Sequence, residues 1–167
     1  MRMLSIFEPG ELVMEDMPRP TLTPGHAIVE IEKCGICGSD VTAYSGKNPT
    51  MKYPVHGLGH EGVGTIVEIG ENEEGFKVGD RVALEPYVPD FSCHMCKVGR
   101  FNNCADLHVC GVHKDGMMTE YFSHPIKLLY KLPDTLNFQR AALVEPLTIG
   151  LHGATRARVS KGDHVVV

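Results

Sequence analysis

The sequence has no long hydrophobic run. Apolar stretches such as LLY at 128–130 and VVV at 165–167 are far shorter than the roughly 20 residues that a transmembrane helix needs, so we expect no membrane span. The first residues, MRMLSIFEPGE, turn acidic and reach a proline before the apolar core of a signal peptide could form. Internal repeats and low-complexity segments are also lacking.

Positive charge is in short supply as well. Lysine and arginine total 16 against 21 aspartates and glutamates, which gives a net charge of -5 and a pI of about 6.0, with no basic stripe. We therefore expect no nucleic-acid partner and no anionic membrane partner. Hydrophobic residues make up 43% of the 167 residues and charged residues 22%, a composition that excludes a disordered chain.

Glycine, proline and cysteine are plentiful by contrast. Eighteen glycines and eleven prolines favour short strands joined by turns over long helices. Six cysteines without a secretory signal indicate a reducing, cytoplasmic location. Clustered cysteines in that compartment bind metal more often than they form disulfides.

Hydrophobic alternation predicts short strands separated by turns. The strands fall at 26–34, 63–69, 81–88 and 126–133, with a turn at 77–80. The last strand is predicted to place four residues on one face, namely Ile126, Leu128, Tyr130 and Leu132. Strands of this length predict a mainly β fold, either a partly closed barrel or a sandwich.

Helical patterns replace the strands after Pro133. A short helix is predicted at 137–145 with Asn137 as its cap, and Pro146 is expected to break or restart it. A second helix, at 146–158, carries Leu147, Leu151 and Ala154 on one face. The residues HVVV at 164–167 resemble a buried strand that has only begun.

The segment DFSCHMCKVGRFNNC at 90–104 is the most specific motif in the chain. Its spacing, C-x2-C-x7-C, offers the thiolates of Cys93, Cys96 and Cys104 as three corners of a tetrahedral zinc site. Asp90 continues the x2 spacing and could supply a fourth ligand, while His94 is a competing candidate that would point away from Cys93. The alternative is three reduced cysteines that bind no metal.

A second set of metal-ligand residues is dispersed along the chain. Cys37 lies in GICGSD, His60 and Glu61 lie in GHE, and Glu145 lies in VEPL. Cysteine, histidine and carboxylate ligands with one open position are typical of a catalytic zinc site. Glu145 precedes Pro146, which biases it away from helical dihedrals and toward a break beside a cleft.

Each of these residues also has a simpler interpretation. Cys37 could be a small core residue, His60 a turn histidine and Glu145 a solvated charge at a helix end. Cys34 and Cys37 repeat the C-x2-C spacing, but they lie too far from Cys93 for a zinc ribbon, so Cys34 is predicted to be a small buried residue and Cys110 a core residue.

The segment GLGHEG at 57–62 matches the G-x-G-x-x-G fingerprint of dinucleotide-binding proteins. That fingerprint requires a strand before it and a helix after it, whereas here YPVH precedes it and a β-branched strand follows. The glycines are therefore predicted to form tight turns around His60 rather than to bind phosphate.

Taken together, these motifs resemble the zinc-dependent medium-chain alcohol dehydrogenase superfamily, and most closely its polyol, threonine and sugar-acid dehydrogenases. The resemblance rests on the order and spacing of GICGSD, GHEGVGTIVEIG, KVGDRV, the cysteine segment, DGMMTEY and VEPLTIG. It implies a GroES-like, partly open β-barrel at 1–145 with a structural-zinc lobe at 88–110. Residues 146–167 would then be a linking helix and the first strand of a Rossmann domain that this chain lacks.

The resemblance also implies roles for individual residues. Cys37 and His60 match the ligands of the catalytic zinc, Glu61 matches an exchangeable carboxylate ligand, and Glu145 matches a further ligand that binds directly or through water. Asp40 matches a carboxylate that orients the zinc-bound histidine, and Ser39 a hydroxyl that relays the substrate proton. The structural zinc would be held by Asp90, Cys93, Cys96 and Cys104.

Two residues depart from the family pattern. Asp90 stands where the family usually has its first structural cysteine, so zinc would be bound more weakly or not at all. Thr42 stands where many members have a histidine that ends the proton relay, so proton release would need water or another group.

The implied activity is NAD- or NADP-dependent oxidation of a secondary alcohol in a polyol, a sugar acid or a hydroxy amino acid. The nicotinamide cofactor would be held by the absent domain, and the full-length protein would form a homo-oligomer. A non-catalytic, zinc-stabilised interaction module is the alternative, because fold alone does not establish function. A zinc-free quinone-reductase-like domain is disfavoured by GHE and by the cysteine segment.

Overall fold

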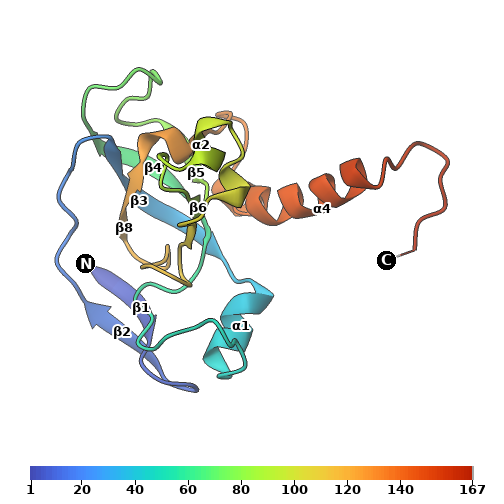
Figure 1. Ribbon diagram of the computed structural model, residues 1–167. Helices are drawn as coiled ribbons and strands as arrows, with labels where there is room; N and C mark the ends of the chain where they lie inside the picture. Colours follow the sequence, from blue (N-terminus) through green and yellow to red (C-terminus); the bar gives the residue numbers. More distant parts are fainter. Residues whose placement is uncertain (167) are drawn as a thin grey trace.

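The computed structural model describes residues 1–166 and is built around one antiparallel sheet (Figure 1). The five strands of this sheet lie in the spatial order β8 (Tyr121–Pro125), β3 (His26–Gly35), β4 (Glu61–Ile69), β5 (Arg81–Leu84) and β9 (Leu129–Lys131). Two-stranded sheets are formed by β1 (Arg2–Ile6) with β2 (Leu12–Asp16), and by β6 (Tyr87–Val88) with β7 (His108–Val109).

The helices are few and mostly short. They are α1 (Gly38–Tyr44), α2 (His94–Lys97), α3 (Phe138–Ala141) and α4 (Val144–Arg156), with 3-10 turns η1 (Phe101–Asn103) and η2 (Ile126–Leu128). Within the described residues the five-stranded sheet does not pair β8 with β9, so it stays open. The predicted mainly β fold with a partly open barrel is therefore confirmed.

The main core lies against the central strand β3. Ala27, Ile28 and Val29 are all fully buried. Ala27 and Val29 belong to the main core cluster and Ile28 does not, so alternation is kept and Ile28 is buried on the opposite face of the sheet. A second cluster around Ile6 and Val55 attaches the β1–β2 hairpin to the rest of the domain.

Two predicted strands are shorter than expected. Strand 81–88 is interrupted at Glu85 and the fully buried Pro86, which separate β5 from β6. Segment 126–133 begins as the turn η2, whose period of three shifts the alternation. Leu129 is consequently buried and Tyr130 is 58% exposed, contrary to the predicted common face.

The C-terminal helices also begin and end at other residues than predicted. The Asn137 side chain accepts a hydrogen bond from the Arg140 N–H at 2.9 Å, as expected for a cap, but α3 ends at Ala141. Helix α4 already begins at Val144, before Pro146. A proline in the first turn breaks no helical hydrogen bond, because the N–H groups of that turn have no partner within the helix.

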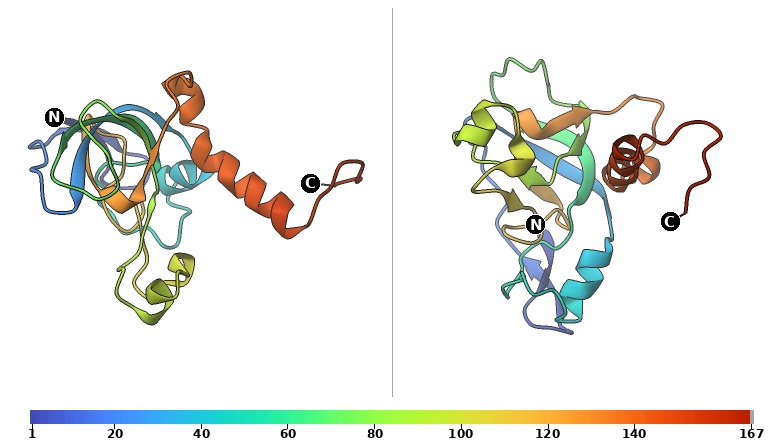
Figure 2. Two further views of the ribbon diagram at one scale, coloured as in Figure 1. Left: turned by 90° about the horizontal axis from the view of Figure 1, so that it is seen from above. Right: turned by 45° about the vertical axis from the view of Figure 1, so that its right-hand side comes forward.

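Helix α4 extends away from the sheet and has no buried residue (Figures 1 and 2). The predicted apolar face is exposed, with Leu147 at 67% and Leu151 at 63%. His164–Val166 do not form the predicted strand, and Val167 lies outside the described residues.

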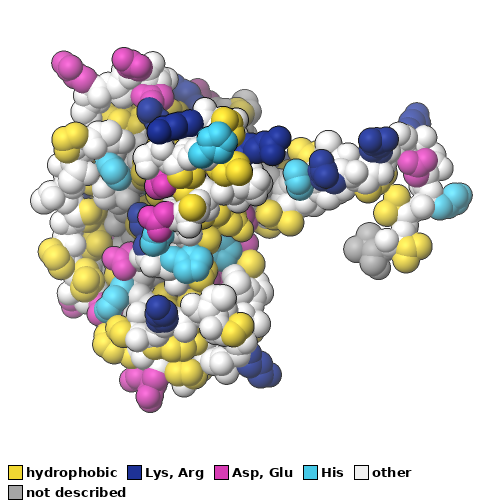
Figure 3. Space-filling view, in the orientation of Figure 1, with side chains coloured by type: hydrophobic (Ala, Val, Ile, Leu, Met, Phe, Trp, Pro, Cys, Tyr) yellow, Lys and Arg dark blue, Asp and Glu magenta, His cyan; other side chains and the backbone are white. Residues whose placement is uncertain are grey.

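The lobe that contains α2 projects from another side of the sheet than α4 (Figure 2). On the face shown in Figure 3, several separate basic side chains lie along α4 and the adjoining upper part of the molecule, whereas most acidic side chains lie over the body of the domain. No helix among residues 1–166 combines the length and the apolar character required to cross a membrane.

Candidate metal centres

Glycines position His60 where two backbone segments cross. Gly57 and Gly59 have φ angles of +58° and +87°, a region that favours glycine. The Met117 N–H donates to the Gly59 carbonyl at 2.9 Å, and a side chain on Gly116 would overlap the backbone of Gly57. The glycines of GLGHEG thus serve backbone packing in this structure, and no helix follows them.

Cys37 is fixed by the N-terminus of α1. It is the N-cap residue, and the buried Asp40 accepts a hydrogen bond from the Cys37 N–H at 2.8 Å. Burial raises the pKa of the Asp40 carboxyl, while the Cys37 N–H and His60 oppose that shift. Asp40 therefore holds the backbone that carries the Cys37 thiol.

Cys37, His60 and Glu61 come together although they are distant in sequence. One ligand atom from each lies within 4.8 Å of the others. His60 and Glu61 are buried at the start of β4, whereas Cys37 precedes α1. The sheet and the helix, rather than one loop, fix this set of donors.

Unsatisfied polar atoms surround the same three residues. The His60 Nδ1 atom is buried without a hydrogen-bond partner and lies 3.9 Å from Asp40 Oδ1. The Ser39 Oγ atom is buried and unpartnered as well. Buried polar atoms that lack partners are costly unless a ligand satisfies them, and a sulfur, nitrogen and oxygen donor set suits zinc. The residues present therefore fit a zinc ion.

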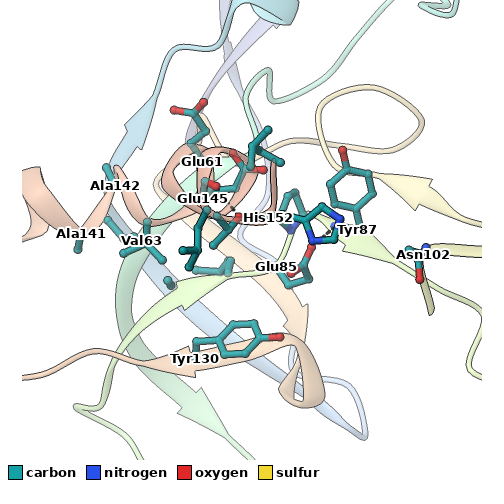
Figure 4. A pocket seen from close by; sticks show the side chains of 18 of the residues that line it. Glu61, Val63, Glu85, Tyr87, Asn102, Tyr130, Ala141, Ala142, Glu145 and His152 are labelled. Carbon is teal, nitrogen blue, oxygen red and sulfur yellow. Dashed lines mark hydrogen bonds between the residues drawn. The ribbon is translucent and has the colours of Figure 1, made fainter. Parts of the chain in front are cut away.

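Glu145 lies in the same groove as Glu61. It projects from the first turn of α4, which corrects the prediction that it sits at a break outside the helix. With Glu61 it lines a groove of about 790 Å³ between α4 and the sheet (Figure 4). Burial raises the pKa of Glu145, the positive charge of His60 opposes this, and Glu61 and Glu85 add to it. The three-residue donor set does not include Glu145.

Thr42 lies one turn along α1 from Ser39. Its hydroxyl donates to the Ser39 carbonyl at 2.9 Å, and its side chain is exposed. Thr42 is thus in contact with solvent and with the backbone of Ser39.

A second donor set lies in the lobe. Ligand atoms of Asp90, Cys93, Cys96 and Cys104 lie within 4.8 Å of one another, whereas His94 is exposed and outside the set. The Asp90 carboxylate accepts hydrogen bonds from the N–H groups of Ser92 and Cys93, at 2.8 and 2.9 Å. These bonds fold the loop that brings Asp90 beside the thiols.

The electrostatics of the lobe depend on backbone donors. The N–H groups of Cys93 and Ser92 hold the pKa of Asp90 well below its usual range. The N–H groups of Ala105 and Cys96 lower the pKa of Cys93, whereas desolvation raises that of Cys96 to about 12. Three thiols and one carboxylate that converge in this way fit a tetrahedral zinc site, in which the positive ion would favour the thiolates.

The remaining cysteines lie outside both donor sets. Cys110 is fully buried in the main core, and burial raises its pKa to about 12. Cys34 is half-buried against the same core, and burial raises its pKa to about 12 as well. Neither joins a zinc ribbon, in agreement with the interpretation from sequence.

Two residues of the groove were not found by sequence analysis. Glu85 and Tyr87 line it opposite α4 (Figure 4). The strand predicted at 81–88 would place both on one face, and this was the only signal in the sequence.

The structure combines an open β-domain with two donor sets, one in the thiol-rich lobe and one dispersed along the chain. This combination is that of a domain with two potential metal sites. Residues 23–134 match the family described as the alcohol dehydrogenase GroES-like domain. The chain belongs to this family and to the zinc-dependent medium-chain alcohol dehydrogenase superfamily.

Individual relatives support the same assignment. An uncharacterized zinc-type alcohol dehydrogenase-like protein of Haemophilus influenzae is 42% identical over 165 residues, 98% of this chain and 48% of that protein. Sorbitol dehydrogenase of Ovis aries is 36% identical over 98% of this chain and 47% of its own length. The chain spans about half the length of the curated relatives that it matches.

A solved structure also matches this chain over nearly its whole length. The crystal structure of RspB, a short chain alcohol dehydrogenase of Escherichia coli CFT073 complexed with NADH, superposes with a TM-score of 0.87 at 37% identity. The match covers 98% of this chain and 47% of that one.

Proposed function

We propose that this chain is the metal-binding, catalytic half of a zinc-dependent dehydrogenase that oxidises a secondary alcohol of a polyol or a related sugar derivative. The observation that supports this most directly is the convergence of Cys37, His60 and Glu61 beside a groove that could admit a small molecule. Sorbitol dehydrogenase among the relatives supports a polyhydroxylated substrate. Sugar acids and hydroxy amino acids are the other substrate classes considered.

Domain organisation follows from the same proposal. Residues 1–145 would form the catalytic domain, with the structural-zinc lobe at 88–110, and residues 146–167 would lead toward a nucleotide-binding domain. Support comes from the family match at 23–134 and from α4, which has no buried residue.

Cys37, His60 and Glu61 would hold the catalytic zinc, with Glu145 as an additional or water-mediated ligand. Zinc would supply a Lewis acid that lowers the pKa of the alcohol hydroxyl, and a nicotinamide, NAD or NADP, would supply the hydride acceptor. Asp40 would help to orient the His60 ring electrostatically, since its Oδ1 lies 3.9 Å from Nδ1, beyond hydrogen-bond distance. Asp90, Cys93, Cys96 and Cys104 would hold a structural zinc.

The hydroxyl of Ser39 would take the substrate proton, a role supported by its buried Oγ, which no group among residues 1–166 engages by a hydrogen bond. Thr42 cannot continue the relay as a histidine would, but its exposed hydroxyl adjoins the Ser39 backbone. We expect the proton to pass from Ser39 to solvent water.

Metal analysis tests the proposal. Two zinc ions per chain are expected, with Cys37→Ser and Cys96→Ser each removing one. One zinc that only Cys96→Ser removes would instead support a non-catalytic, zinc-stabilised module, and no zinc would refute both.

The 167-residue chain alone is expected to bind zinc but to show no polyol-dependent reduction of NAD or NADP, followed by nicotinamide absorbance. Turnover by the pure chain would contradict the assignment of cofactor binding to another domain.

A further inference from the structure

The groove beside the dispersed donor set carries negative charge and no fixed positive charge. Its lining includes Glu61, Glu85 and Glu145 together with the imidazole of His152, but within the described residues no lysine or arginine. Glu61, which lines the groove, directly follows His60, whose buried Nδ1 atom has no hydrogen-bond partner among the described residues. The groove thus combines an unsatisfied donor set with an unusual excess of carboxylates.

Glu85 differs from the other two carboxylates because it belongs to no donor set. If a divalent ion is bound, its two charges are balanced by the Cys37 thiolate and the Glu61 carboxylate. Glu85 would remain outside this balance, and it forms no salt bridge with another described residue. A half-buried carboxylate without a cationic partner is energetically unfavourable, and such groups occur more often at functional sites.

The backbone of Glu85 is fixed on both sides. Its N–H donates to the Leu128 carbonyl at 2.9 Å, and its own carbonyl lies 2.9 Å from Nε2 of the fully buried His124. The next residue, Pro86, is fully buried, and its carbonyl accepts from the Cys110 N–H at 3.0 Å. The carboxylate therefore projects into the groove from a rigid position.

The carboxylate of Glu85 is only partly satisfied. Oε1 accepts a hydrogen bond from the Tyr87 N–H at 3.3 Å, and no donor among residues 1–166 engages Oε2. Burial raises the pKa of Glu85, and the Tyr87 N–H opposes the shift. The Tyr87 side chain borders the same groove (Figure 4), so a hydroxyl donor and a free acceptor lie on one wall.

We infer that Glu85 is a specificity-determining residue that accepts a hydrogen bond from a substrate hydroxyl remote from the reacting carbon and excludes substrates that carry a carboxylate or a phosphate. This inference rests on the proposed function and narrows it to uncharged polyols. Hydroxyl groups donate readily to a carboxylate, whereas a second anion in the same groove is repelled at low ionic strength.

The test uses the zinc-loaded full-length protein that contains this chain, with sorbitol as the uncharged probe and galactonate as the anionic one. Dissociation constants are measured by calorimetry without cofactor, and kcat and KM with cofactor. Wild type is expected to prefer sorbitol by at least about tenfold in both binding and kcat/KM. Glu85→Gln is expected to reduce this preference to about threefold or less, mainly through KM.

Three controls accompany this measurement. Glu85→Asp keeps the charge and should retain most of the exclusion of galactonate, whereas Glu8→Gln removes an exposed carboxylate outside the groove and should change nothing. Raising the salt concentration should weaken the exclusion in wild type but not in Glu85→Gln.

The outcomes separate the two proposals. Glu85-dependent preference for sorbitol in binding, without turnover of any alcohol, supports this inference and refutes the proposed dehydrogenase activity. Turnover with equal or better use of galactonate, or a preference that Glu85→Gln leaves unchanged, overturns the inference and leaves the dehydrogenase activity standing. Failure of both probes to bind overturns it as well.

Discussion

The carboxylate of Glu61 occupies the space that a side chain at residue 35 would need. Gly35 and Glu61 are paired across β3 and β4, and a methyl group on Gly35 would overlap Glu61 Oε2. The absence of a side chain at residue 35 thus allows Glu61 to turn toward Cys37 and His60. One glycine of the GICGSD motif therefore shapes the donor set without contributing a ligand.

Replacement of Gly35 should consequently weaken metal binding. Gly35→Ala is expected to displace the Glu61 carboxylate and to lower zinc affinity at the Cys37 site by about tenfold or more, the range seen when the surroundings of a ligand are disturbed. Competition with a chromophoric chelator measures the affinity. Gly38→Ala is the matched control, because a Cβ there meets no atom within 4 Å. Equal zinc affinities of the two variants would contradict the expectation.

Asp90 offers a test of the lobe. Asp90→Asn keeps an oxygen that can accept from the Ser92 and Cys93 N–H groups but loses the charge, so zinc affinity at the lobe should fall about tenfold or more. Asp90→Cys should bind zinc more tightly than wild type, because zinc favours thiolate ligands.

Chelator competition again provides the measurement for the lobe. Asp106→Asn is a suitable control, since Asp106 lies in the same lobe, is exposed and pairs with His108 at 3.0 Å. Unchanged zinc affinity in Asp90→Asn would show that Asp90 shapes the loop but does not bind the ion.

His124 should make the fold sensitive to acid. It is fully buried, and burial lowers its pKa from 6.5 to about 3. Above pH 6.5 the histidine is neutral in both states, so the fold bears no penalty. Between pH 6.5 and 3 the unfolded chain takes up a proton that the folded chain does not, and unfolding becomes easier by about 1.4 kcal/mol per pH unit.

Denaturant unfolding at pH 7 and pH 5 measures this effect. Wild type should lose about 2 kcal/mol more than His124→Asn between these two pH values, whatever the variant costs at pH 7. The exposed His164 provides a control, since His164→Asn should behave as wild type does. A pH dependence that His124→Asn leaves intact would argue against a neutral buried histidine.

Ser39 provides a kinetic prediction for the full-length protein. Ser39→Ala removes the buried hydroxyl that we propose accepts the substrate proton, and kcat should fall about 100-fold with little change in KM. Thr42→Val should have a much smaller effect, because the Thr42 hydroxyl donates to the Ser39 carbonyl and not to its side chain. Comparable losses of kcat in the two variants would contradict this division of roles.

The sequence allowed the lobe to be predicted in more detail than the dispersed site. Asp90, Cys93, Cys96 and Cys104 lie within 15 residues, and short loops bring such residues together whatever the rest of the chain does. Cys37 and His60 meet only because β3 pairs with β4, a contact that spacing alone does not reveal. The resemblance to a family, rather than any local pattern, carried that prediction.

The errors have local physical causes. The alternation at 126–133 did not reveal the turn η2. Ile126 and Leu128 are buried in that turn, and a strand would bury the same two residues, so their apolar character fits either element. Pro146 suggested a break, but a proline is tolerated in the first turn of a helix, and α4 uses it there. Glu85 was missed because the alternation at 81–88 places it on one face with Tyr87 but does not indicate whether that face borders a groove or solvent.

Glu145 lies on α4, whereas Cys37, His60 and Glu61 belong to the sheet and to α1. Since α4 has no buried residue and supplies no member of either donor set, the sheet, α1 and the lobe hold those sets without it. Under the proposed function, Glu145 would be the one link between this helix and the metal. Substitutions at Thr148, Leu151 or Thr155, which also line the groove, are therefore expected to change its shape while the Cys37, His60 and Glu61 donors stay in place.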